Sequence, residues 1–316
     1  MLSRVANAIY WLNRYIERAE NVARFIDANY HMTLDIPDNA SDQWQPLINT
    51  TGDHELFKEL YGNATRESAI EFLAFDRNNH NSIYSCVRAA RENARSIREY
   101  ISSEMWEQLN TFYLMMNTAA RESSLDIPHQ FFVDIMNASH TFIGITESTM
   151  THGEGWNFGR MGRMLERADK TSRILDVKYF ILLPSVDYVG SPYDNILWAA
   201  LLRSASAFEM YRKRFGRIDP KKIVDFLLLE RNFPRSIHYC LATAMTSMSL
   251  ITGSLRGTYA NRAEQELGRL MTEFQYASLE EIFAYGLHEY LDNTQTRVNE
   301  VGSAIHDVFF DLDIEA

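Results

Sequence analysis

The stretch Arg14–Asp27, RYIERAENVARFID, occurs a second time as Arg163–Asp176, RMLERADKTSRILD. When the first copy is shifted by 149 positions, six of the fourteen aligned residues are identical, and each copy carries a Glu-Arg pair at the same place. Average composition would supply roughly one identity by chance over such a length. The sequence therefore predicts an internal duplication, with a charged helix at the start of each half.

A second pair of blocks supports the duplication. FDRNNHNSIYSC at 75–86 and LERNFPRSIHYC at 229–240 share five identical residues, including the closing cysteine. The shift is 154 here, so the second half has gained about five residues between the two motifs, a change that a loop tolerates. We expect a single helical unit over 1–316, made of two pseudo-repeats at about 1–149 and 150–316.

Composition favours helices over sheets. Only seven Pro and fourteen Gly interrupt the 316 residues, and no hairpin dipeptides separate alternating β-branched runs. The apolar residues of 3–34 fall in one sector of a helical wheel, as in an amphipathic helix. The predicted fold class is an all-α helical bundle built from two pseudo-repeated halves, each starting with a long charged amphipathic helix.

Prolines and capping residues predict where helices begin and end. Residues 35–52, which contain Pro37 and Pro46, are expected to form an irregular connector. Ser278 and Glu281 match a capping box, which predicts a last helix of about thirty residues. The other helices are expected at 3–34, near 53–61 and 65–75, at about 80–100 and 103–120, from Pro128 to near Met150, at 156–183, at 192–215, from Pro220 and from Pro234.

Charge and hydropathy exclude two classes of partner. The net charge of −11 argues against a nucleic-acid surface, because phosphate binding needs a concentrated positive field. No apolar run approaches the roughly 18 residues of a membrane span, and the charged N-terminal region does not resemble a signal peptide. We therefore expect a cytoplasmic protein that binds neither nucleic acid nor membrane.

The charged helices differ from an ordinary solvated face. Acid and Arg recur in the same order in both copies, with Lys170 the lone Lys, and the planar fork of Arg suits buried or bidentate contacts. If the two helices pack antiparallel across a pseudo-twofold axis, their charges face each other. They would then form either a structural network or a site for an anionic or amino-acid-like ligand, to which Arg77 and Arg231 could add. The candidate binding residues are Arg14, Glu17, Arg18, Glu20, Arg77, Arg91, Arg163, Glu166, Arg167, Asp169 and Arg231.

Glu17 and Glu166 are the candidate catalytic bases. Flanking arginines should lower the pKa of each carboxyl, which suits a general base poorly at neutral pH and favours binding over catalysis. The spacings Glu17-x-x-Glu20 and Glu166-x-x-Asp169 offer an alternative use as metal ligands. A di-iron bundle also needs Glu-x-x-His, which this chain lacks, so we predict no metal site there. Nucleotide-binding and hydrolase motifs are missing too, and no cofactor is expected.

Three long motifs in the right order resemble the bacterial Alpha-E family, formerly the domain of unknown function 403, over essentially the whole chain. They are LSRVANAIYWLNRYIERAENVARFID, DRNNHNSIYSCVRAARENARSIREYISSEMWE and WNFGRMGRMLERADKTSRILD. One departure is Asn13, where the family's first motif usually has Gly, and it removes a flexible or close-packing point. The motif residues of the family fall here on Arg14, Glu17, Arg18, Glu20, Arg91, Glu92, Glu104, Trp106, Arg163, Glu166 and Arg167.

The resemblance implies an all-helical protein encoded beside, or fused to, a circularly permuted ATP-grasp protein, often with a transglutaminase-like or protease-like protein nearby. That context implies a part in ATP-dependent amide or peptide ligation, or in peptide modification. The Arg/Glu cluster would then bind the acceptor amine, a peptide or the ligase itself. Two alternatives stay open: a stand-alone enzyme that acts on a peptide-like substrate with a Glu base, and a purely structural helical scaffold.

Overall fold

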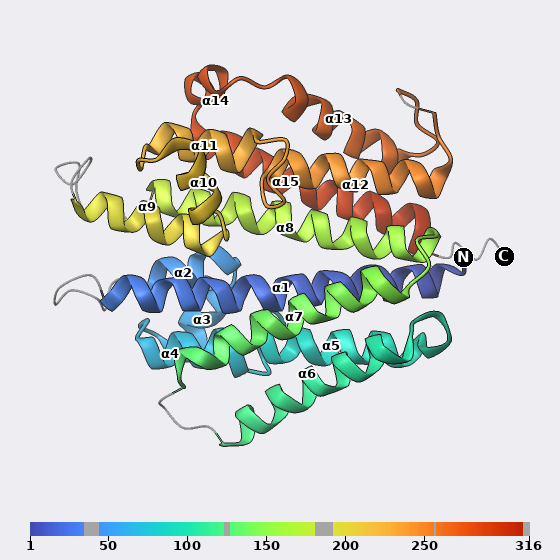
Figure 1. Cartoon of the computed structure of the whole chain (residues 1–316), viewed down its shortest axis with the longest axis horizontal. Helices are drawn as coiled ribbons and strands as arrows, with labels where there is room; N and C mark the ends of the chain where they lie inside the picture. Colours follow the sequence, from blue (N-terminus) through green and yellow to red (C-terminus); the bar gives the residue numbers. More distant parts are fainter. Residues whose placement is uncertain (35–43, 123–126, 181–191, 256, 312–316) are drawn as a thin grey trace.

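The computed structural model describes residues 1–34, 44–122, 127–180, 192–255 and 257–311, and all regular structure in these ranges is helical (Figure 1). The described residues contain no strand, which confirms the predicted all-α class. The elements up to residue 149 are α1 (Ser3–Leu34), α2 (Trp44–Thr51), α3 (His54–Tyr61), α4 (Arg66–Ile70), η2 (Glu71–Phe75), α5 (Ile83–Ser96), η3 (Arg98–Tyr100), α6 (Ser103–Glu122) and α7 (His129–Thr149). The later elements are α8 (Glu154–Phe180), α9 (Pro192–Ser204), α10 (Phe208–Phe215), α11 (Pro220–Leu229), α12 (Ile237–Thr252), α13 (Arg262–Tyr276), α14 (Leu279–Tyr285), α15 (Leu287–Ile305) and η5 (His306–Phe310).

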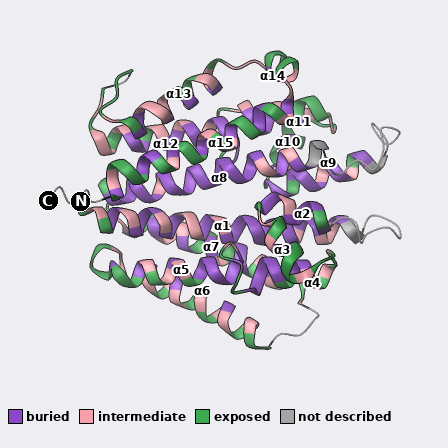
Figure 2. Cartoon of the chain, turned by 180° about the vertical axis from the view of Figure 1, so that it is seen from behind, coloured by how far each residue is buried: buried purple, intermediate pink, exposed green. Residues whose placement is uncertain are grey.

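The two charged repeats lie on α1 and α8, which run side by side through the middle of the bundle (Figure 1). Helices α5 and α7 pack on α1, and α6 covers both of them. On the opposite side α12 and α15 pack on α8, with α13 outside them. The two central helices are largely buried, whereas the outer helices α6 and α13 keep exposed faces (Figure 2). The layering therefore places both charged repeats at the centre.

Helices α1 and α8 run parallel and do not have the antiparallel arrangement that was considered as a way to bring their charges together. Ile9 lies against Gly155, and Glu17 binds Arg167, which means that contacts advance in the same direction along both helices. The reason is the path of the chain, because α7 returns it to the end of the bundle at which α1 begins (Figure 1). The two sets of charges still face each other, since parallel helices bring equivalent positions level with one another.

Glycines on α8 allow its close approach to α1. A Cβ atom added to Gly162 would lie 2.7 Å from the carbonyl oxygen of Tyr10. A Cβ atom at Gly159 would lie 2.5 Å from the Nδ2 atom of Asn13. Asn13 itself is buried and donates to the carbonyl oxygen of Ile9 at 3.0 Å. A glycine on the facing helix thus makes room for the Asn that replaces the expected Gly.

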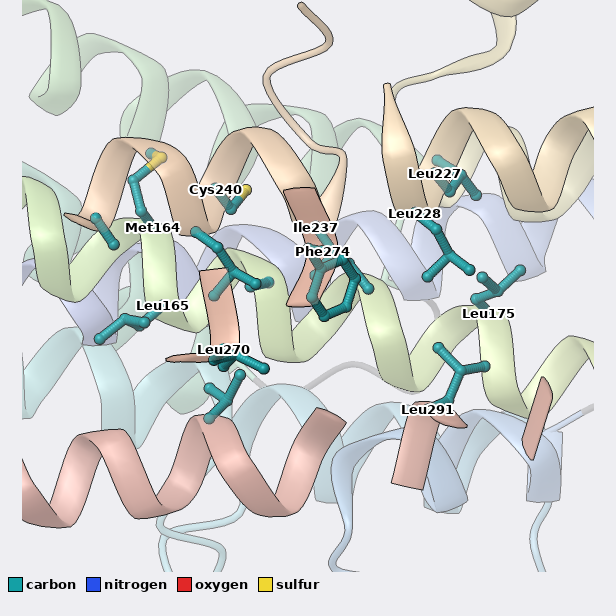
Figure 3. Close-up of a cluster of buried hydrophobic side chains, with 14 of the residues drawn as sticks. Met164, Leu165, Leu175, Leu227, Leu228, Ile237, Cys240, Leu270, Phe274 and Leu291 are labelled. Carbon is teal, nitrogen blue, oxygen red and sulfur yellow. The ribbon is translucent and has the colours of Figure 1, made fainter. Parts of the chain in front are cut away.

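Two apolar cores form on the outer sides of the central pair. The core beside α8 is built mainly with α9–α15, and Figure 3 shows side chains that α8, α11, α12, α13 and α15 contribute to it. The core beside α1 is built mainly with α2–α7. Apolar burial contributes roughly 25 cal/mol per Å² and holds each central helix to its own set of neighbours. The middle of the α1–α8 interface is left to polar side chains.

One boundary differs from the prediction, and another cannot be compared with it. Residues 44–51 form α2 instead of an irregular connector, while 35–43 lie outside the described residues. Pro46 falls in the first turn of α2, where an N–H group has no intrahelical partner and its loss costs little. The predicted end of α8 at Pro184 also lies outside the described residues.

Two predicted long helices are each divided in two. The helix expected at 192–215 breaks between α9 and α10, where Ser206 adopts a left-handed φ of 49°. The N–H of Ala207 returns to the carbonyl oxygen of Leu202 at 2.7 Å, which closes the preceding turn. The capping box of Ser278 is confirmed, but Gly286, with φ 112°, separates the short α14 from α15. Positive φ angles at these two positions end regular helix.

Capping chemistry is confirmed elsewhere in the second half. Asp219 accepts from the N–H of Lys222 and α11 begins at Pro220, as expected. Helix α12 begins at Ile237, after Pro234, because Ser236 caps it.

Two expectations concern the whole chain. No helix among the described residues is long and apolar enough to cross a bilayer. The division into pseudo-repeats at about 1–149 and 150–316 stays a prediction from the sequence.

Replacing Gly162 with Ala should lower the free energy of unfolding by about 1–3 kcal/mol, because the added methyl group meets the backbone carbonyl of Tyr10. Gly144→Ala on α7 is the matched control. Nothing lies within 4 Å of its Cβ position, so alanine should stabilise the helix there by about 0.5–1 kcal/mol. Urea denaturation measures both changes, and equal stability of the two variants would contradict the close approach of α1 and α8.

Candidate functional site

Two Glu-Arg pairs bind each other reciprocally across the α1–α8 interface. The guanidinium of Arg18 donates to both carboxylate oxygens of Glu166, at 2.6 and 2.9 Å. Arg167 donates to both oxygens of Glu17, at 2.8 Å each. Neither glutamate has any solvent exposure. We call these four residues, with the side chains that donate to them, the central network.

Further contacts complete the half of the network around Glu166. Arg14 donates to Glu166 Oε2 at 2.9 Å, and its guanidinium lies 4.9 Å from the centre of the Trp11 ring. Arg18 uses its remaining terminal nitrogen to donate to Asn81 Oδ1 at 2.6 Å. Both oxygens of Glu166 are therefore occupied by arginine donors. This half of the network is closed.

Arg235, from the turn before α12, joins the other half of the network. It donates to Glu17 Oε1 at 3.4 Å and to Asn21 Oδ1 at 2.9 Å, and it also binds Glu20. Asn21 in turn donates to Glu17 Oε1 at 3.0 Å. Both carboxylate oxygens of Glu17 therefore already accept hydrogen bonds, as those of Glu166 do.

The network is incomplete at Glu20. Its Oε1 atom accepts from Arg24, Arg235 and His140, the last at 3.0 Å. Its Oε2 atom is buried and has no hydrogen-bond partner, and the same is true of the Nε atom of Arg24. Of the three donors to Glu20, His140 on α7 is the exposed one, with a side-chain exposure of 55%. One acceptor and one donor therefore stay uncommitted beside a surface histidine.

Asp169, which aligns with Glu20, is neutralised within its own helix. Arg173 donates to both of its carboxylate oxygens, at 3.0 and 2.9 Å. The Nζ atom of Lys170 lies 3.2 Å from Asp169 and 3.9 Å from Glu166. Lys170 thus links Asp169 to the edge of the central network.

The glutamates of the network are held in the ionised state. Burial by itself would raise the pKa of Glu17, but the charge and hydrogen bonds of Arg167 outweigh it and lower the pKa. Glu166 has a pKa well below its ordinary value, because Arg18 overcomes the same desolvation. The pKa of Glu20 is likewise well below its ordinary value. The expectation of lowered carboxyl pKa values next to arginine is confirmed.

Arg77 and Arg231 do not add to the central network, so that expectation is wrong. Both are exposed: the guanidinium of Arg77 lies 5.0 Å from the centre of the Tyr84 ring, and Arg231 donates to the carbonyl oxygen of Gln275 at 3.3 Å. Each lies five residues before the capping serine of the next helix, in a turn that follows the surface.

Arg91 and Arg163 also lie apart from the paired glutamates. Arg91 donates to Asn110 at 2.9 Å and lies over the Trp106 ring, which connects α5 to α6. Arg163 donates to Glu147 at 2.9 Å and connects α8 to the end of α7. Both have structural roles in these contacts.

The sequence-based prediction missed Arg235, Asn81 and His140. Arg235 and Asn81 align in the second pair of blocks, each directly before a capping serine, and both contact the arginines or glutamates of the network. The sequence did show a polar residue before the capping serine in both blocks, and this repeated position could have identified them. His140 carries no sequence signal, because only the packing of α7 on α1 brings it to Glu20.

A cavity of about 40 Å³ lies between α1, α2, α8 and α9, away from the network. Its lining is mainly apolar and includes Phe25, Leu47, Ile174 and Leu201. A space of this size holds only a few water molecules.

Replacing Glu166 with Gln should lower the free energy of unfolding by about 3–5 kcal/mol, because it leaves two largely buried guanidinium groups without a carboxylate. Glu266→Gln is the control, since its partner Arg269 is 60% exposed and such surface pairs contribute about 0–1 kcal/mol. Urea midpoints followed by circular dichroism measure the two changes. Equal, small losses of stability in the two variants would show that the ion pairs of Glu166 are exposed to water.

Stability should also fall in acid. The carboxyls of Glu17, Glu20 and Glu166 have lower pKa values in the folded protein than in an unfolded chain, so protons bind the unfolded chain more tightly. Their contribution is complete above the ordinary Glu pKa of about 4.3 and is lost as the pH falls below it. The urea midpoint should therefore drop in acid, and less so in Glu166→Gln. An equally steep drop in that variant would assign the acid sensitivity to other groups.

A family model matches almost the whole chain. The model of the Alpha-E family, described as a predicted α-helical domain with a conserved ER motif, matches residues 1–310. Glu17-Arg18 and Glu166-Arg167 are two such Glu-Arg pairs in this chain.

Uncharacterized proteins of Mycobacterium bovis and of two strains of Mycobacterium tuberculosis are 23% identical to it over 308 residues. The match covers 90% of this chain but 34% of each relative, so the chain spans about a third of the length of these curated relatives. No solved structure matches. Since the family model spans nearly the whole sequence, the chain belongs to the Alpha-E family.

Proposed function

We propose that this chain is a non-catalytic accessory unit of an ATP-grasp-linked amide or peptide ligation system. In this role it holds an amino-acid-like group of the acceptor at the incomplete end of the central network. The observation that carries the proposal is the pair of uncommitted atoms, Glu20 Oε2 and Arg24 Nε, next to the exposed His140.

The two uncommitted atoms match the two ends of an amino acid. A carboxylate oxygen accepts from an ammonium group, and the N–H of a guanidinium donates to a carboxylate, both as charge-assisted hydrogen bonds. Glu20 and Arg24 lie one turn apart on α1, so both face the same side. Rotation of His140 away from Glu20 would open a path to them from the surface, because its side chain is already half in solvent. The proposed ligand therefore enters between α1 and α7.

The lowered pKa values favour binding over catalysis. A general base works best when its pKa lies near the operating pH, whereas Glu17 and Glu166 are held below the ordinary range by their arginines. Both carboxylates are also occupied by donors on each oxygen. A stand-alone enzyme with either glutamate as its base is therefore the weaker hypothesis.

The partnership with a ligase rests on the family and on the length of the relatives. Alpha-E proteins are expected beside, or fused to, a circularly permuted ATP-grasp protein, and the mycobacterial relatives carry about twice as much further sequence as the matched segment. ATP-grasp enzymes activate a carboxylate as an acyl phosphate, which an amine then attacks. A unit that positions the amine would raise the rate of that attack by proximity. A transglutaminase-like protein is a second candidate partner.

The test combines this chain with a circularly permuted ATP-grasp protein of the kind expected beside Alpha-E proteins. It measures binding and ATP-dependent phosphate release with amino acids and short peptides. We expect a stable complex whose turnover depends on this chain. Glu20→Gln should reduce the stimulation by about tenfold or more, since it replaces the acceptor of a charge-assisted bond. Glu166→Gln is the control, because it makes the same change of carboxylate to amide in the closed part of the network.

The possible outcomes separate the three hypotheses. Loss in Glu20→Gln but not in Glu166→Gln, both measured where they are folded, supports a ligand at Glu20. Equal losses would indicate that the network acts only through the stability of the bundle, as in a scaffold. Turnover by the isolated chain, abolished in Glu17→Gln, would make it an enzyme. Failure to bind the ATP-grasp protein would refute the accessory role.

A further inference from the structure

A cluster of metal-ligating side chains lies farther along the contact between α1 and α7. Asp27 and His31 are one turn apart on α1, and His129 is the first residue of α7. The Oδ1 atom of Asp27 lies 2.7 Å from His129 Nδ1 and 3.9 Å from His31 Nε2. The Nε2 atoms of the two histidines are 3.0 Å apart. The three side chains are the one group in the described residues whose possible ligand atoms all lie within 4.8 Å of one another.

Two buried polar atoms of this cluster have no hydrogen-bond partner within it. Asp27 Oδ1 and His129 Nδ1 are both buried, and in spite of their short separation neither has a hydrogen-bond partner in acceptable geometry. The Nε2 atoms of His31 and His129 share one N–H···N hydrogen bond, so one of these two nitrogens is unprotonated and has the lone pair that a metal ion would need.

We infer that Asp27, His31 and His129 bind a divalent transition-metal ion such as Zn²⁺. One ion can use only one ring nitrogen of His129. With one ligand atom from each residue, the three atoms lie within 4.8 Å of one another, compared with roughly 3.3 Å in a tetrahedral zinc site with bonds of about 2.0–2.1 Å. Two imidazoles and a carboxylate are ligands that zinc prefers. Three protein ligands leave a fourth position for water or another small ligand.

The surroundings of the cluster fit a fixed site. The Tyr30 ring lies 6.0 Å from the ring of His31 and 6.1 Å from that of His129, between centroids, and so restrains both imidazoles. The nearby positive charge of Arg24, one turn before Asp27, is bound by Glu20. The side chains of His31 and His129 are 41% and 34% exposed, so an ion can reach them from solvent.

The second half of the chain contains a natural comparison. Asp176, which aligns with Asp27, binds His288 Nδ1 at 2.7 Å in a regular hydrogen bond. No third ligand residue lies within reach of that pair among the described residues. The Asp176–His288 pair thus forms a regular hydrogen bond between two helices, whereas Asp27 Oδ1 and His129 Nδ1 form none. The third ligand, His31, is what distinguishes the proposed metal site.

The test uses the full chain without a polyhistidine tag, stripped of metal with a chelator and titrated with Zn²⁺ in competition with a chromogenic chelator of micromolar affinity. We expect one ion per chain, and Co²⁺ in its place should give the absorption of a tetrahedral site. His31→Ala and His129→Ala should each weaken binding by more than about tenfold, because even outer-shell partners of a metal contribute that much. His288→Ala is the matched control and should bind as the unchanged chain does.

Circular dichroism shows whether each variant is folded. We expect both histidine variants to fold, because the side chains of His31 and His129 are partly exposed. Binding that is weaker than the chelator, or that is the same in His31→Ala and His288→Ala, would overturn the inference and leave a pair of hydrogen-bonded histidines. The readout does not involve the ATP-grasp protein. The metal site and the accessory function can therefore fail separately.

Discussion

Two carboxylates without solvent exposure, Glu17 and Glu166, are the constraint on which the rest of the structure depends. Moving a carboxylate out of water costs several kcal/mol, and only close, well-oriented cations offset that cost. Each glutamate receives a bidentate guanidinium from the other helix, which meets the requirement with two parallel hydrogen bonds. Because each pair needs residues of both helices, α1 and α8 can satisfy their buried charges only in one register.

The surrounding architecture follows from that register. Glycines at 159 and 162 let α8 lie against the α1 backbone, so the guanidinium groups reach across a short gap. Apolar cores on the two outer sides supply most of the burial, and residues such as Tyr10 of α1 and Ile174 of α8 join the core of the other helix. The polar interface between them therefore contributes specificity of packing more than net stability, a division that buried ion pairs show in some other proteins.

The contact between α1 and α7 is where the network reaches the surface. Glu20 and Arg24 keep one acceptor and one donor uncommitted beside His140. Asp27 and His31 follow farther along α1, where they meet His129 of α7. The equivalent region of the second half is closed, because Asp169 is neutralised by its own helix and Asp176 binds His288. The two halves thus share a structural centre but differ in what they offer to a ligand, which places both proposals on one side of the molecule.

The sequence by itself determined the helical class and the two charged helices, and it placed Arg14, Glu17, Arg18, Glu166 and Arg167 among the candidate residues of a charged cluster. These depend on local periodicity, capping and repetition, which one stretch of chain contains completely. It did not determine the parallel arrangement, the breaks at Ser206 and Gly286, or the arrival of Arg235, His140 and His129 beside α1. Those are contacts between residues far apart in the chain, and only the packing of the helices decides which side chains they bring together.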